Sequence, residues 1–103
     1  MTEFVRIMSK ADLPAEGEAR EIDCGEYQLC IARLGGEISV MNNICPHNGG
    51  PLGQGIIENG KIVCPWHAWA FDLKTGAAEH EPRARVPIYE HKIEGDDVLA
   101  KLE

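Results

Sequence analysis

The chain has 103 residues, and we expect one domain over residues 1–103. It carries 10 Lys and Arg against 17 Asp and Glu, a net charge of −7, which argues against nucleic acid as a partner because phosphate binding needs a basic face. No apolar stretch approaches the roughly 18 residues of a membrane span, and the N-terminus lacks the pattern of a secretory signal. We therefore expect a cytoplasmic monomer with reduced cysteines and no membrane contact.

Short strands separated by turn residues predict an all-β sandwich or barrel. The first predicted strand is Phe4–Met8. Ser9 is a candidate N-cap for one helical turn over Lys10–Leu13, which Pro14 would end.

A hairpin is predicted from Ala19–Asp23 and Tyr27–Leu34, whose apolar residues alternate as a strand requires. With its tip at residues 25 and 26, Cys24 and Cys30 are not cross-strand partners. A disulfide needs Cβ atoms roughly 3.5–4.5 Å apart, so we expect both to be free structural cysteines.

A glycine pair at residues 35 and 36 turns the chain into a predicted strand over Glu37–Met41. Glycine and proline are then so dense in Ile44–Gly55 that we expect a tight loop without a regular element. These residues are Pro46, Gly49, Gly50, Pro51, Gly53 and Gly55.

The dipeptide Asn59-Gly60 predicts a type I′ hairpin between Ile56–Glu58 and Lys61–Val63. This hairpin would return the chain so that Cys64 comes to lie beside Cys45.

Three further strands are predicted beyond the hairpin: Trp69–Leu73, Val86–Ile93 and Val98–Leu102. The pattern changes in the segment Ala77–Arg85 between the first two, which is polar and contains a proline.

Four residues form the strongest chemical pattern: Cys45, His47, Cys64 and His67, spaced as C-x-H and C-x-x-H with sixteen residues between. A zinc finger pairs like ligands with like, whereas here each pair gives one thiolate and one imidazole. That donor set suits a two-iron cluster in which one iron takes both sulfurs and the other both nitrogens.

The runs Cys45–Leu52 and Cys64–Asp72 resemble the two boxes of Rieske proteins, above all the small soluble Rieske ferredoxins of bacterial ring-hydroxylating oxygenase systems. The resemblance covers most of the chain and is strongest over Ser39–Gly76. It implies a Rieske-type antiparallel β-sandwich in which the two end strands share a base sheet. A cluster-binding lobe is expected as an insertion at about residues 42–76.

The resemblance also implies one Rieske-type 2Fe–2S cluster held by Cys45, His47, Cys64 and His67, with the two imidazoles exposed at the protein tip. The expected function is one-electron transfer from a flavin-dependent reductase to a terminal oxygenase. No catalytic motif is present, so we do not expect an enzyme in its own right.

Comparison with high-potential members of the family predicts a low reduction potential. Their extra pair of box cysteines is replaced here by Gly50 and Trp66, and their Ser and Tyr hydroxyls by Trp69 and Phe71. Loss of hydrogen bonds to sulfur disfavours the more negative reduced state.

Several neighbours of the four candidate ligands also have predicted roles. Gly49, Gly50 and Gly53 would let backbone N–H groups approach sulfur. Trp66 and Trp69 are expected to be packing residues.

Two alternatives remain open at this stage. The chain could be the Rieske-like small subunit of a nitrite reductase, or a structural zinc module that uses the same four ligands. Acidic residues, gathered around 16–26 and 90–97, would serve solubility or steer the protein toward a basic redox partner.

Overall fold

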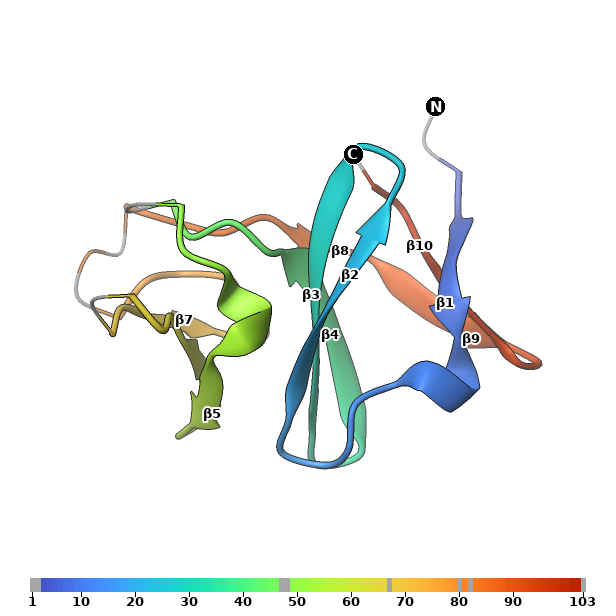
Figure 1. The fold of residues 1–103 in the computed structure, drawn as a ribbon, viewed down its shortest axis with the longest axis horizontal. Coiled ribbons are helices and arrows are strands. Elements are labelled where there is room, and N and C mark those ends of the chain that lie inside the picture. Colours follow the sequence, from blue (N-terminus) through green and yellow to red (C-terminus); the bar gives the residue numbers. More distant parts are fainter. Residues whose placement is uncertain (1–2, 47–48, 67, 80, 82, 103) are drawn as a thin grey trace.

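The computed structural model describes residues 3–46, 49–66, 68–79, 81 and 83–102. Across these residues the chain forms three antiparallel sheets, with strand orders β1-β10-β9, β2-β3-β4-β8 and β5-β6-β7. Figure 1 shows the four-stranded sheet between the other two. The prediction of an all-β antiparallel fold is confirmed.

The bounds of the elements are as follows. The strands are β1 (Val5–Ser9), β2 (Ala19–Cys24), β3 (Tyr27–Leu34), β4 (Glu37–Asn42), β5 (Ile56–Glu58), β6 (Lys61–Val63), β7 (Ala70–Asp72), β8 (Ile88–Tyr89), β9 (His91–Glu94) and β10 (Asp97–Ala100). The 3-10 turns are η1 (Lys10–Asp12) and η2 (Leu52–Gln54).

Strand β3 is buried on both faces at its centre. Leu29 and Ile31 pack into the core shared with β1 and β10, whereas Cys30 and Ala32 pack into the core shared with β6 and β7. Successive side chains of a strand point to opposite faces, so a strand between two layers needs apolar residues at consecutive positions. The run Leu29–Ala32 supplies them.

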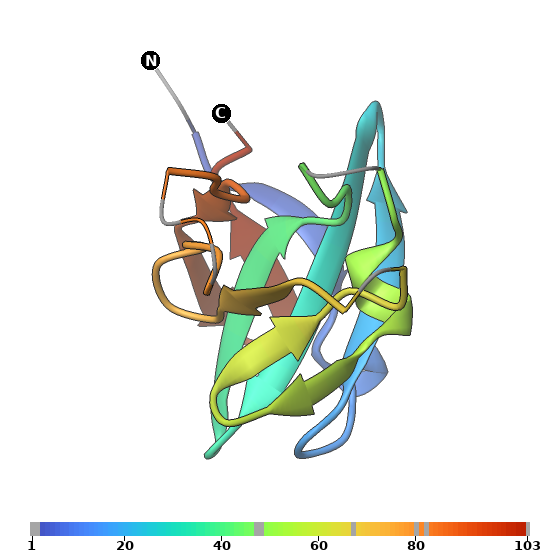
Figure 2. The same cartoon turned by 90° about the vertical axis from the view of Figure 1, so that its left-hand side faces the viewer.

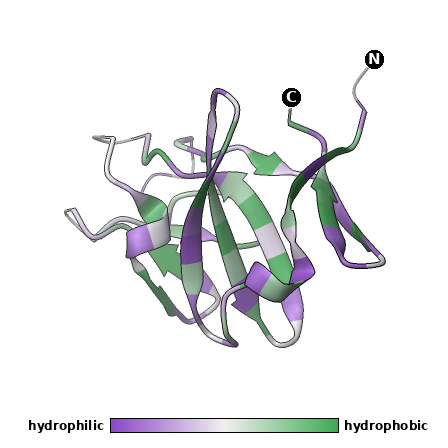
Figure 3. Cartoon of the chain, turned by 45° about the vertical axis from the view of Figure 1, so that its right-hand side comes forward, coloured by the Kyte–Doolittle hydropathy of each residue, from purple (hydrophilic) through white to green (hydrophobic). Residues whose placement is uncertain are grey.

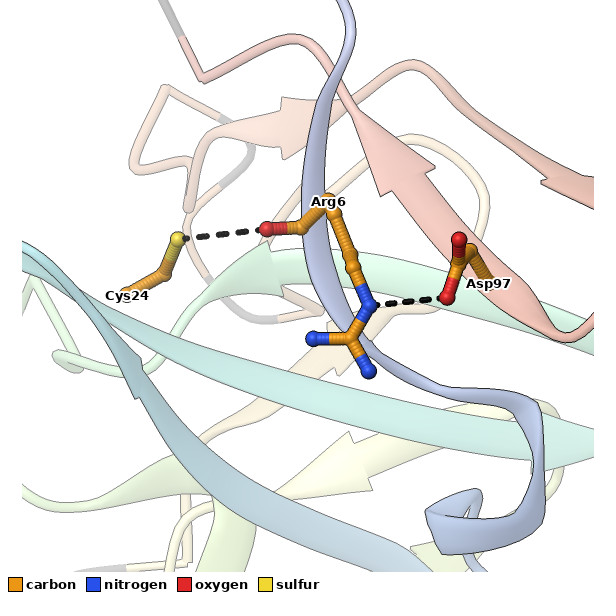
Figure 4. A network of polar contacts seen from close by, with 3 residues as sticks. All are labelled: Arg6, Cys24 and Asp97. Carbon is orange, nitrogen blue, oxygen red and sulfur yellow. Dashed lines mark hydrogen bonds and ion pairs between the residues drawn. The ribbon is translucent and has the colours of Figure 1, made fainter.

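The hairpin of β2 and β3 has the predicted register, in which Cys24 pairs with Tyr27 and Cys30 with Glu21. Both cysteines are free, as expected. Figure 4 shows how β2 meets the sheet β1-β10-β9, called the outer sheet below: the Cys24 thiol lies 3.9 Å from the Arg6 carbonyl oxygen. The Arg6 side chain binds the Asp97 carboxylate at 2.8 Å.

The two end strands pair as predicted, β1 with β10. The single predicted strand Val86–Ile93 is wrong: β8 pairs with β4 in the middle sheet, and β9 pairs with β10 in the outer sheet. Glu90 separates them, and the chain changes sheets there. Tyr89 is buried between the sheets, its ring 6.1 Å from that of Tyr27 and perpendicular to it. No glycine or other turn residue marks the crossing at Glu90, so the sequence pattern alone did not reveal it.

The small sheet β5-β6-β7 packs on the other face of the middle sheet (Figure 2). Positive φ angles at Asn59 (51°) and Gly60 (77°) fit the predicted type I′ turn. Strand β7 is shorter than the predicted Trp69–Leu73. Strand β6 is the central strand of this sheet, and Cys64 comes directly after its last residue.

Two local predictions need correction. The turn after β1 is a 3-10 turn that ends at Asp12, and the Ser9 side chain makes no capping hydrogen bond. The glycine-rich loop, expected to lack regular structure, contains the 3-10 turn η2, which starts after Pro51. Such turns need only three residues and can form between glycines.

No helix among the described residues is long and apolar enough to cross a membrane. Hydrophilic residues gather instead at turns, as at the β9–β10 turn in Figure 3.

Candidate metal centre

Two of the four predicted ligands lie side by side in the structure. Cys45 follows β4 and Cys64 follows β6; each side chain is about 1% exposed, and the two thiols are hydrogen-bonded to each other. Neither forms a disulfide. His47 and His67 lie outside the described residues, so the full ligand set stays a prediction.

The first loop is closed by backbone hydrogen bonds around Cys45. The Cys45 N–H donates to the Gly50 carbonyl at 2.9 Å, and the Gly49 N–H donates to the Cys45 carbonyl at 2.8 Å. Ile44 and Pro51 form an isolated antiparallel bridge at the base of the loop. These bonds hold the thiol-bearing residue inside a tight turn.

The second loop is closed in a similar way. The Cys64 N–H donates to the Trp69 carbonyl at 2.7 Å, and the Trp66 backbone N–H donates to the Cys64 sulfur. Ala68 has φ = 57°, which places a non-glycine residue in the left-handed region. This turn directs the chain back into β7.

Burial raises the pKa of the Cys64 thiol. The Trp66 N–H opposes that rise by favouring the thiolate, whereas the Cys45 thiol beside it adds to the rise. The Cys64 thiol is therefore favoured as a neutral group. A metal that binds it must displace its proton.

Gly50 leaves the space beside the sulfur. A Cβ at this position would lie 2.7 Å from the Cys64 sulfur and 3.2 Å from the Trp66 ring. Paired buried thiols, a backbone donor to sulfur and a glycine without a side chain fit a sulfur-ligated iron centre. Among the described residues, no group of three or more His, Cys, Asp or Glu could hold a metal ion, which agrees with the two histidines lying outside them.

The interior around the two thiols is apolar. It includes Phe71, which is fully buried, and the partly buried Trp69, whose ring lies 6.3 Å from that of Phe71. Trp66, also expected to be a packing residue, is 51% exposed, with its ring beside Gly50. Ile44 beside the first loop is also exposed, at 47%.

Charge is absent from the sequence around the centre. Residues 38–57 and 62–71 contain no Lys, Arg, Asp or Glu, although the chain carries 10 basic and 17 acidic residues. The described parts of these loops therefore present no Lys, Arg, Asp or Glu side chain to a partner.

Gly53 does not serve the predicted purpose of approaching sulfur. It packs against Glu21 of β2 and the Asn43 side chain, and its N–H donates to Asn43 at 2.6 Å. Asn43 is only 3% exposed and was missed as a functional residue. Its position two residues before Cys45 was the available signal, but nothing in the sequence connects it to Glu21.

Comparisons with known proteins agree with this geometry. The family model described as the Rieske [2Fe-2S] domain matches residues 3–90. The ferredoxin component of biphenyl 2,3-dioxygenase from Rhodococcus jostii (strain RHA1) is 35% identical, over 97% of this chain and 94% of its own length. Apoptosis-inducing factor 3 from Homo sapiens is 35% identical over 82% of this chain, which spans only 14% of that longer protein.

Solved structures share the fold. A ferredoxin of Sphingomonas yanoikuyae B1 aligns with a TM-score of 0.86 at 27% identity, covering 98% of this chain and 100% of its own. A protein described as a putative small subunit of NADH-dependent nitrite reductase from Mycobacterium tuberculosis aligns with a TM-score of 0.86, covering 100% and 97%. At 19% identity, that second likeness concerns the fold alone. The family match, the related ferredoxin component and the paired thiols lead to one conclusion: the chain belongs to the Rieske [2Fe-2S] domain family.

Proposed function

We propose that this chain is a cytoplasmic, low-potential one-electron carrier, and that it passes electrons from a flavin-dependent reductase to a terminal oxygenase. In this proposal Cys45, His47, Cys64 and His67 hold one Rieske-type 2Fe–2S cluster. The whole chain is one domain, with a cluster-binding lobe at about residues 42–76. The observation that carries the proposal is the adjacent, buried pair of thiols at the start of the two loops.

The residues around the centre have distinct tasks in this mechanism. Cys45 and Cys64 bind as thiolates, and the Trp66 N–H stabilises the charge on one of them. A bound 2Fe–2S cluster supplies reversible storage of one electron. The surrounding apolar core excludes water from the sulfur side.

Electrons are proposed to leave through the imidazole side, at His47 and His67. Exposed Ile44 and Trp66 provide apolar contact area beside the two loops. A partner could approach there without removing charged side chains from water, since both loops lack Lys, Arg, Asp and Glu. The similarity of this chain to the ferredoxin component of biphenyl 2,3-dioxygenase supports an oxygenase as that partner.

The low potential follows from the surroundings of sulfur. Trp69 and Phe71 have no hydroxyl to donate, and the buried neighbours of the two thiols are apolar. An environment that does not stabilise added negative charge keeps the potential near the lower end of the Rieske range, about −150 mV.

Film voltammetry of anaerobically purified protein, across pH, tests this proposal. We expect one one-electron wave near about −150 mV that is steady around neutral pH. A potential well above zero would contradict the low-potential assignment.

The alternatives have separate readouts. A colourless protein with stoichiometric zinc would favour the structural zinc module. Co-purification with a large sirohaem protein would favour the nitrite reductase subunit.

A further inference from the structure

We propose that Glu21 on β2 is a positioning residue that fixes the first ligand loop, through Asn43 and Gln54. This inference rests on the proposed function, because that loop carries Cys45 and His47. No sequence motif connects Glu21 with the loop, and the connection exists only in the folded chain.

Asn43 closes the loop at both ends. Its backbone carbonyl accepts the Leu52 N–H at 2.8 Å, and its side-chain Oδ1 accepts the Gly53 N–H at 2.6 Å. Its own N–H donates to the Gln28 carbonyl on β3 at 2.8 Å. One buried residue thus joins the entry of the loop, the exit of the loop and the middle sheet.

Glu21 holds Asn43 in that orientation. The Asn43 side-chain N–H donates to Glu21 Oε2 at 2.7 Å, and the Gln54 side-chain N–H donates to Glu21 Oε1 at 2.9 Å. Each carboxylate oxygen therefore binds one end of the loop. Hydrogen bonds to an ionised carboxylate are stronger than those between neutral groups.

Gly53 brings the loop into direct contact with β2. A Cβ at Gly53 would lie 2.5 Å from the Glu21 Cγ and 2.8 Å from the Glu21 backbone nitrogen. The absence of a side chain at this position lets η2 rest on the strand where Glu21 stands. Contact and hydrogen bonds therefore converge on one residue of β2.

Fixing both ends of the loop limits how far Cys45 can move from Cys64. Residues outside the ligand set that orient ligands tune both metal affinity and electronic properties. Loss of the Glu21 carboxylate should therefore loosen the centre, although Glu21 itself is solvent-exposed.

The test compares Glu21→Ala with Glu21→Gln in the cluster-loaded protein. The rate of cluster release to an iron chelator and the low-temperature EPR spectrum of the reduced protein are measured. We expect Glu21→Ala to release iron about ten-fold faster, as for the loss of hydrogen bonds to a charged group, and to broaden the EPR signal. Glu21→Gln should stay near wild type, because its amide oxygen can accept from Asn43 and its NH₂ can donate to a flipped Gln54 amide.

Asp23→Ala is the matched control, because Asp23 is an exposed acidic residue on the same face of β2. It removes the same charge outside this network and should release iron at the wild-type rate. A Glu21→Gln variant as impaired as Glu21→Ala, or an equally impaired Asp23→Ala, would show a charge effect and overturn the positioning role.

An exchange of the two polar groups gives a second test. Gln54→Glu places a second carboxylate beside Glu21 and should speed iron release. The double variant Glu21→Gln with Gln54→Glu again pairs one amide donor with one carboxylate, so its rate of iron release should return toward wild type. Failure of the double variant to recover would contradict the proposal. A wild-type protein that takes up no 2Fe–2S cluster would instead refute the proposed function, whereas a cluster-loaded protein indifferent to Glu21→Ala refutes this inference alone.

Discussion

Ala68, in the second ligand loop, has an energetically unfavourable backbone conformation. It has φ = 57°, where an L-residue other than glycine is strained, and its side chain is exposed. Left-handed backbone costs an alanine roughly 1 kcal/mol relative to glycine. The turn between Trp66 and Trp69 is thus held by the surrounding hydrogen bonds against a local preference.

Ala68→Gly should therefore stabilise the protein by about 1 kcal/mol. Urea unfolding of wild type and variant, prepared with equal cluster content, measures the difference. An unchanged or lower midpoint would mean that the turn tolerates alanine without strain.

Cys30 is inert for a physical reason. Burial, with a smaller contribution from the Glu21 charge, raises the pKa of the Cys30 thiol from 9.0 to about 12. The folded protein holds this proton more tightly than the unfolded chain does. The stability that the neutral thiol contributes is therefore fully present below pH 9 and is lost as the pH rises toward 12.

Brief alkylation of the native protein at pH 8 should label the half-buried Cys24 and leave Cys30 unmodified. Peptide mapping by mass spectrometry reads the outcome, with urea-unfolded protein as the control in which both react. Labelling of Cys30 in the native protein would show that the middle sheet opens more readily than this packing allows.

At the scale of elements, the small sheet depends on one close backbone approach. A Cβ at Gly55 would collide with the Val63 carbonyl oxygen, although the Gly55 backbone itself is extended and unstrained, with φ = −83°. Gly60 in the same hairpin has the opposite properties: φ is 77°, and a Cβ would meet nothing within 4 Å. Substituting each glycine therefore distinguishes the free-energy cost of a steric collision from that of an unfavourable backbone conformation.

Gly55→Ala should lower the free energy of unfolding by about 3 kcal/mol, because backbone must move to admit the methyl group. Gly60→Ala should cost only about 1 kcal/mol, from its left-handed φ. Denaturant unfolding of both variants checks the order; equal losses would mean that η2 and β6 separate easily.

At the scale of the molecule, the charged residues lie outside the two sequence segments that carry the candidate centre. The net charge is −7, whereas residues 38–57 and 62–71 carry no Lys, Arg, Asp or Glu. The long-range field is therefore set by the rest of the molecule, and close contact at the loops is governed by apolar groups.

Stopped-flow oxidation of the reduced protein should accordingly depend on salt in opposite directions for two small oxidants. The rate with a cationic cobalt(III) complex should fall as ionic strength rises, and the rate with anionic ferricyanide should increase, because salt screens attraction and repulsion alike. A rate insensitive to salt with both oxidants would show that the net charge does not reach the electron exit.

Turn chemistry made much of the fold predictable. The dipeptide Asn59-Gly60 located the small hairpin, and a hairpin tip placed at residues 25 and 26 gave the correct register of β2 and β3. The change of sheet at Glu90 was not predictable, because no turn residue separates β8 from β9, although the two strands pair with different partners.

The sequence by itself determined the thiol and imidazole pattern, the all-β class and the family resemblance, since each depends on local spacing. Tertiary structure alone decided that Trp66 is exposed and that Glu21 reaches Asn43. Those facts depend on which strands pair and which faces are covered. Contacts between residues far apart in the chain follow from packing, for which local pattern carries no signal.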